Sequence, residues 1–197
     1  MNHYPDYKKA TNSAYELLTL RTSFSLATNV FAIVEELLEN CKLLTYGQVC
    51  FLYGYTPGML LEASEYGFSI VKGNRRIILY NEAVPLGCIR FTIAHEIGHY
   101  VLKHQDEQDA GAEKEANCFA RNLLCPVPVV FCMGLETAQD YVSMFDVTPK
   151  MATVSFDKKK SDRYYITKDL WNLTAEMVDA HMMGFADINE YHQFLAS

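Results

Sequence analysis

The chain has 197 residues, of which 50% are hydrophobic and 21% are charged, a balance that excludes a disordered chain and favours a folded core. Its formal net charge is −7 and its basic residues form no long stripe, so direct binding to nucleic acid is not expected. The sequence has no apolar run of about 18 residues and no apolar N-terminal segment, so we expect no membrane segment, no signal peptide and a cytoplasmic location.

The first half of the chain is predicted to contain helices followed by a hairpin. Residues 14–38 carry apolar side chains at steps of three and four, which predicts two helices divided near residues 22–25. Residues 42–53 are aliphatic and aromatic and predict a strand. Residues 67–80 predict two strands joined by a turn at Gly73, because glycine tolerates positive φ.

The second half is predicted to be helical. A long helix follows Pro85, and another helix covers about residues 113–124 and stops before Pro126. Further helices are predicted at residues 136–145, from Pro149 after a cap at Thr148, at 170–183 and at 188–195.

The chain shows no internal repeat and no long linker. We therefore predict one domain over residues 1–165, which includes the N-terminal helices, and a helical extension over residues 166–197 that packs on the same core. The six cysteines form no Cys-x-x-Cys pair and are predicted to be reduced.

The segment His95-Glu96-Ile97-Gly98-His99 contains the residues on which the functional prediction depends. On an α-helix, positions i and i+4 share one face, so His95 and His99 can reach one ion at the roughly 2 Å that Zn²⁺ requires. Glu96 projects about 100° further around the axis. Its carboxylate is therefore expected beside the ion, where it can act as general base towards a water molecule. The spacing predicts a hydrolytic site with Zn²⁺ as cofactor.

A catalytic zinc site needs a third protein ligand. No histidine stands six residues after the motif, and His104, one place earlier, is expected to point well away from the metal face. The next predicted helix offers Glu113 and Glu115, which lie about 200° apart around its axis. Glu113 is favoured, because Asn117 follows on the same face and can hydrogen-bond a ligand histidine. Glu115 stays open as the alternative.

Two sequence patterns extend this motif. Residues 90–99 follow Arg-Phe-Thr-x-Ala-His-Glu-x-Gly-His, and residues 113–126 follow Glu-x-x-Ala-Asn-x-Phe-Ala-x-x-Leu-Leu-x-Pro. Together they resemble the ImmA/IrrE family of bacterial metallopeptidases. The resemblance implies an α+β, zincin-like fold of the gluzincin type, in which a small antiparallel sheet packs on the motif helix and the rest is mainly helical. It also implies zinc on His95, His99 and Glu113, with Glu96 as the base.

The resemblance further implies a role in relieving a helix-turn-helix repressor. Our leading hypothesis is a zinc-dependent endopeptidase that cleaves such a DNA-binding protein and holds it along the predicted strand at residues 76–80. An alternative is a zinc-stabilised binding module that sequesters the repressor without cleavage. Hydrolysis of a small amide also stays open, because the motif specifies only the activation of water. Tyr80, Tyr100 and Tyr164 are unranked candidates for stabilising an oxyanion. The sequence does not predict an oligomeric state.

Overall fold

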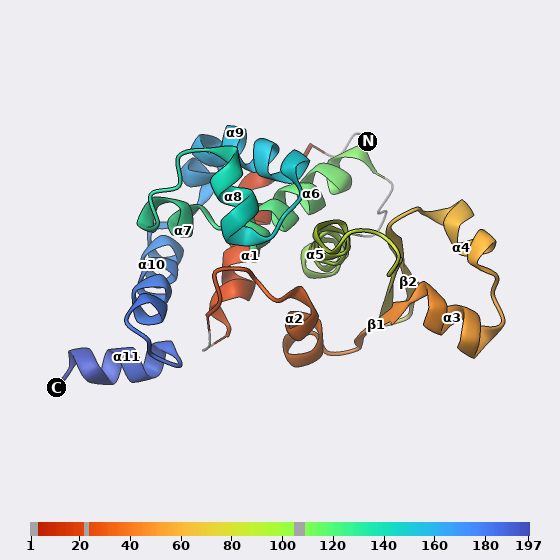
Figure 1. Cartoon of the computed structure of the whole chain (residues 1–197), viewed down its shortest axis with the longest axis horizontal. Coiled ribbons are helices and arrows are strands. Elements are labelled where there is room, and N and C mark those ends of the chain that lie inside the picture. The colour runs from red at the N-terminus through yellow and green to blue at the C-terminus, as the bar shows by residue number, and fades with distance from the viewer. Residues whose placement is uncertain (1–3, 22–23, 105–108) are drawn as a thin grey trace.

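The computed structural model describes residues 4–21, 24–104 and 109–197, so the predicted helix break at residues 22–25 lies partly outside the described residues. Figure 1 shows the arrangement of the elements along the chain. In chain order they are α1 (Tyr7–Thr19), α2 (Val30–Leu37), β1 (Cys41–Thr45), α3 (Tyr46–Tyr53), α4 (Pro57–Ala63), β2 (Gly67–Lys72), β3 (Arg75–Tyr80), α5 (Leu86–Leu102), α6 (Ala110–Leu124), α7 (Val127–Cys132), α8 (Ala138–Phe145), α9 (Pro149–Tyr165), α10 (Lys168–Met182) and α11 (Ile188–Leu195).

The predicted α+β class is confirmed, but the sheet is mixed and not antiparallel throughout. Its strand order is β1-β3-β2, with β3 antiparallel to β2 and parallel to β1. The reason is the connection between the strands: β2 and β3 form the expected hairpin, whereas β1 is separated from it by α3 and α4 and joins on the far side of β3. Because β3 is the central strand, it has no free edge for a substrate, and that expectation was wrong.

The strand predicted over residues 42–53 is also corrected. It ends at Thr45, where α3 begins. The Thr45 side chain accepts a hydrogen bond from the backbone N–H of Gln48, and the Gln48 side chain accepts one from the backbone N–H of Thr45. This capping box starts a helix although the residues that follow favour a strand.

Helix α5 lies at the centre of the fold, between the sheet and the pair formed by α1 and α6 (Figure 1). Ile93 and Ile97 of α5 are fully buried and belong to the same apolar cluster as Phe119 and Leu123 of α6. Burial of such side chains stabilises a fold by about 1.5–3 kcal/mol each. Within the described ranges, no helix combines the length and apolar character that crossing a bilayer requires.

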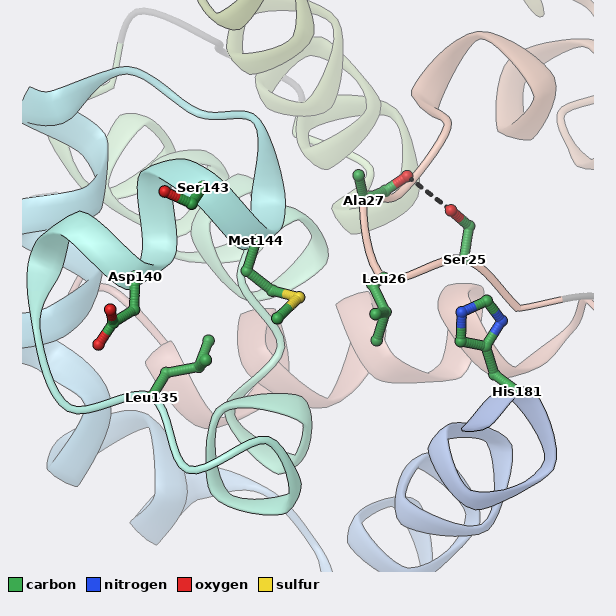
Figure 2. A pocket seen from close by; sticks show the side chains of 8 residues that line it. All are labelled: Ser25, Leu26, Ala27, Leu135, Asp140, Ser143, Met144 and His181. Carbon is green, nitrogen blue, oxygen red and sulfur yellow. Dashed lines mark hydrogen bonds between the residues drawn. The ribbon is translucent and has the colours of Figure 1, made fainter. Parts of the chain in front are cut away.

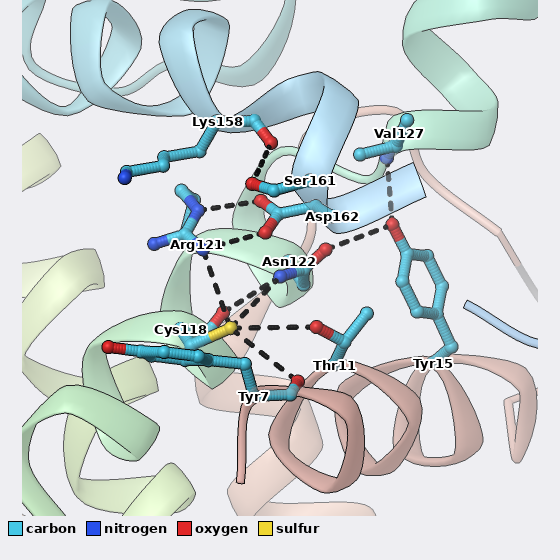
Figure 3. A network of polar contacts seen from close by, with 10 residues as sticks. All are labelled: Tyr7, Thr11, Tyr15, Cys118, Arg121, Asn122, Val127, Lys158, Ser161 and Asp162. Carbon is cyan, nitrogen blue, oxygen red and sulfur yellow. Dashed lines mark hydrogen bonds and ion pairs between the residues drawn. The ribbon is translucent and has the colours of Figure 1, made fainter. Parts of the chain in front are cut away.

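A polar network ties α6 to its neighbours (Figure 3). Arg121 of α6 donates two hydrogen bonds to the carboxylate of Asp162 in α9, at 2.7 and 2.8 Å. On the other side, the Tyr15 hydroxyl of α1 donates to the Asn122 side chain at 3.3 Å and accepts from the backbone N–H of Val127 at 2.8 Å. These contacts hold the C-terminal half of α6 against α9, α1 and the start of α7.

The C-terminal helices differ in how they are attached. Helix α10 contacts α1 and α7, and its Val178 belongs to the main apolar cluster. Helix α11 contacts α10, and Tyr191 is its buried residue. In Figure 1, α11 lies at the opposite end of the molecule from the sheet.

Candidate metal centre

Helix α5 brings the two motif histidines together. They lie one turn apart, and their Nε2 atoms are separated by 3.0 Å. His99 is 1% exposed, so its ring is enclosed by the core. Glu96 lies between them in sequence and is also buried.

Helix α6 brings Glu113 to the same point. Its Oε2 lies 3.6 Å from Nε2 of His95, and its Oε1 lies 3.4 Å from Nε2 of His99. This approach depends on Gly98, because a Cβ atom there would lie 3.2 Å from the Cα of Ala116 on α6. The close crossing of the two helices therefore sets the position of the carboxylate.

The three side chains form a group that can hold a metal ion: each offers one ligand atom, and these atoms all lie within 4.8 Å of one another. Ligands at about 2.0–2.1 Å from a tetrahedral ion are separated by about 3.3 Å. The distances between His95, His99 and Glu113, from 3.0 to 3.6 Å, match this spacing. Two imidazole nitrogens and one carboxylate are also a donor set of the kind found in catalytic zinc sites. The residues thus fit a bound ion in both geometry and chemistry.

Burial opposes a positive charge on both histidines, but their pKa values shift in opposite directions. Burial, together with the charges of His95 and His104, lowers the pKa of His99 to about 3, which keeps this ring neutral near pH 7. Burial also opposes charge on His95, but a hydrogen bond to Glu113 and the carboxylate charges of Glu96 and Glu113 outweigh it and raise the pKa of His95. The hydrogen bond with His95 lowers the pKa of Glu113, although burial opposes this. Ligand histidines must be neutral, so an ion that binds here competes with a proton on His95.

The carboxylate of Glu96 is held from the sheet. Ser69 on β2 donates a hydrogen bond from its Oγ to Oε2 of Glu96 at 2.5 Å. Nη1 of Arg76, a buried residue of β3, lies 3.8 Å from the same oxygen. Neither Ser69 nor Arg76 is predicted as a site residue by the sequence patterns. Arg76 follows Arg75 at the start of β3, and only the burial of Arg76 in the fold separates the two arginines.

A cleft of about 710 Å³ opens beside these residues. Phe68 of β2 lines it on the sheet side, and Met151 of α9 lines it on the helical side. Its lining also includes His95, Glu96, Glu113 and Asn117. Asn117 is expected near a ligand histidine. Burial is the largest influence on the pKa of His95 and lowers it, whereas a hydrogen bond from Asn117 is among the interactions that raise it.

The three tyrosines considered from the sequence do not line this cleft. The hydroxyl of Tyr100 donates to the carbonyl of Glu39 at 2.7 Å, and Tyr164 is 85% exposed. Tyr66, which follows α4, does line the cleft. No sequence pattern distinguishes Tyr66 from the other tyrosines, because its position depends on how β2 packs against α5.

Glu115 and His104 contact each other and lie away from the Nε2 atoms of His95 and His99. Glu115 is buried, and its Oε2 lies 2.9 Å from Nε2 of His104. Nδ1 of His104 lies 2.9 Å from Nδ1 of His99. His104 therefore lies on the Nδ1 side of His99, whereas Nε2 of His99 faces His95 and Glu113, and it is outside the group that can hold the ion, as expected. Its contact with His99 is not predicted by the sequence.

A second hollow of about 400 Å³ lies between α8, α10 and the segment before α2 (Figure 2). Asp140 and His181 lie on opposite sides of it in Figure 2. Asp140 already accepts hydrogen bonds from the backbone N–H groups of Glu136 and Thr137. These two titratable groups do not converge, so they form no joint site.

The fold and the site define a class: an α+β protein in which a motif helix and the following helix form a candidate metal centre. The family model described as IrrE N-terminal-like domain, a peptidase family, matches residues 59–130, from α4 into α7. This match confirms the resemblance to the ImmA/IrrE family over the part of the chain that carries the site. No curated protein and no solved structure matches the chain.

Proposed function

We propose that this protein is a zinc-dependent endopeptidase that hydrolyses a peptide bond in a protein substrate. The observation that supports this most is the convergence of His95, His99 and Glu113, at 3.0–3.6 Å, beside an open cleft. These three residues are the proposed zinc ligands, and Asn117 supports His95 from the same helix as Glu113.

Zinc at this position supplies Lewis-acid chemistry, since it acidifies water and polarises a carbonyl group. Glu96 is the proposed general base: its carboxylate takes a proton from the attacking water and passes it to the leaving amine. The hydrogen bond from Ser69 fixes the direction of this carboxylate. The positive charge of Arg76 beside it favours the ionised form that a base requires.

The substrate is proposed to pair with β2. Among the strands described, β2 has only β3 as a neighbour, so its other edge can accept an extended peptide. Gly67 and Phe68 at its start line the cleft, and Ser69 contacts Glu96. A peptide bound along this edge would therefore run past the proposed base and the metal ligands.

A DNA-binding repressor remains the proposed substrate class. The similarity to the ImmA/IrrE family supports it, and so does charge. The chain carries a formal net charge of −7, which attracts basic proteins of the kind that bind DNA.

Replacing Glu96 with glutamine tests the mechanism. We expect Glu96→Gln to lose at least about 100-fold in the rate of substrate cleavage, because proton transfer contributes about 10²–10⁴-fold. Zinc content should stay equal to that of the wild type, since Glu96 is not a proposed ligand. Glu62→Gln on exposed α4 is the matched control and should leave cleavage unchanged.

The same variant separates cleavage from sequestration. If wild type and Glu96→Gln bind and relieve a repressor equally well, the protein is a zinc-stabilised binding module. A purified Glu96→Gln protein that still cuts its substrate at the wild-type rate would reject the proposed role of Glu96.

A further inference from the structure

Helix α5 ends in a turn that reverses the chain onto the candidate metal centre. Lys103 has a φ of 59°, in the left-handed region. The backbone N–H of Lys103 donates to the carbonyl of Tyr100, and that of His104 donates to the carbonyl of His99, both at 3.2 Å. These two bonds form a Schellman motif. The motif brings His104 back over the last turn of α5, where a continued helix would have carried it away.

A line of hydrogen bonds starts from the far nitrogen of His99. Nδ1 of His99 lies 2.9 Å from Nδ1 of His104, and Nε2 of His104 lies 2.9 Å from Oε2 of Glu115. Oε1 of Glu115 accepts from the backbone N–H of Asp6, the N-cap of α1, at 2.6 Å. The side chains of His104 and Glu115 are only 7% and 3% exposed, so water cannot readily replace these partners.

The protons in this line can be counted. A carboxylate has no hydrogen to donate, so Glu115 requires a proton on Nε2 of His104. A neutral His104 then has an acceptor at Nδ1, which requires the proton of His99 to be on Nδ1. Nε2 of His99 is left with its lone pair, directed at His95 and Glu113.

We propose that His104 and Glu115 are positioning residues that select the Nδ1–H tautomer of His99 and so prepare its Nε2 to bind a metal ion. This inference rests on the metal site of the proposed function. The opposite arrangement, with a proton on Nε2 of His99, would make Nδ1 of His99 an acceptor facing the acceptor nitrogen of His104. Hydrogen bonding to the second nitrogen of a ligand histidine fixes both its tautomer and its ring direction.

Zinc affinity tests the proposal. We expect His104→Phe, which keeps a ring but removes both nitrogens, to weaken zinc binding about 10- to 100-fold in a chelator competition assay. His104→Asn keeps an acceptor near the position of Nδ1 and should lose less affinity than His104→Phe. His192→Phe is the matched control: it removes a histidine that pairs with Glu176 at 3.0 Å on the exposed surface of α10 and α11, and should bind zinc as the wild type does.

A second measurement does not depend on any variant folding. In metal-free wild-type protein, ¹⁵N NMR of the histidine rings should show the proton of His99 on Nδ1. A proton on Nε2 would overturn the proposal. So would a zinc affinity of folded His104→Phe within about threefold of the wild type, or equal losses in the two His104 variants. Failure of the wild type to bind zinc would instead reject the proposed function.

Discussion

Two carboxylates on α6, separated by one residue, face different surroundings. The side chain of Glu113 is 45% exposed at the cleft, next to the motif histidines. The side chain of Glu115 is 3% exposed and is held by His104 and by the backbone of Asp6. Successive helix positions rotate by about 100°, so residues 113 and 115 point in nearly opposite directions. One carboxylate is thus available to an ion, and the other supports the fold.

Alanine substitutions at these two positions should have different effects. Glu113→Ala removes a proposed ligand, so the purified protein is expected to contain little zinc while its thermal stability without metal changes little. Glu115→Ala leaves buried donors without a partner, which costs about 1–3 kcal/mol of unfolding free energy, and it should retain zinc at reduced affinity. Elemental analysis and thermal unfolding measure both effects, with exposed Glu136→Ala as control. The opposite pattern of metal loss would assign the ligand to Glu115.

At the residue scale, the sequence predicts the site residues whose positions depend on a single helix. It does not predict those whose positions depend on the end of that helix or on the sheet. The spacing of His95 and His99 is a local property of α5, and the structure brings Glu113 to them. Ser69 reaches the site only because β2 packs against α5, a tertiary contact. The contact of His104 with His99 is not predicted, because it depends on the left-handed conformation of Lys103, which a glycine would normally signal.

At the scale of elements, the crossing of α5 and α6 controls the site. These two helices make the most extensive contact between any two described elements, and Gly98 lies in close contact with α6. Besides the Cα of Ala116, a Cβ atom at Gly98 would meet the ring of Phe119 at 3.2 Å. Both neighbours are fully buried and cannot move into solvent. A larger residue must therefore push the helices apart.

We expect Gly98→Val to destabilise the protein by about 1–3 kcal/mol, the usual cost of overpacking a core. It should also weaken zinc binding, because Glu113 moves with α6. Chemical denaturation and zinc titration measure the two effects. Gly58→Val on α4 is the matched control, since the nearest atom to a Cβ there is Oγ1 of Thr56 at 4.0 Å. Equal behaviour of the two variants would contradict this view of the crossing.

Helices whose start signal agrees with the residues that follow are predictable from the sequence. Helices whose start signal conflicts with β-prone residues are not. Helix α9 begins at Pro149 after Thr148, whose side chain accepts from the backbone of Met151, as the sequence indicated. Helix α3 has an equally good signal at Thr45, but the β-prone residues that follow it indicate a strand. The parallel pairing of β1 with β3 could not be read locally, because it depends on the path of the chain through α3 and α4.

At the scale of the whole molecule, the cleft lies between two parts that α5 holds together. The sheet and α4 supply one wall, and α6 and α9 supply the other. Arg121 lines the cleft and pairs with Asp162, so the helical wall is fixed by the polar network in Figure 3. The C-terminal helices α10 and α11 do not line the cleft. Helix α10 packs on α1 and α7, and α11 packs on α10.

Truncation should therefore distinguish the contributions of α10 and α11 to the stability of the fold. Deleting residues 167–197 removes α10 with its buried Met177 and Val178, each contributing about 1.5–3 kcal/mol by burial. That is a large part of a typical stability of about 5–15 kcal/mol, so the midpoint of urea unfolding should fall sharply. Deleting residues 186–197 removes only α11 and should lower the midpoint slightly. If the longer deletion unfolds like the full chain, residues 166–197 do not share the core and form an independent extension.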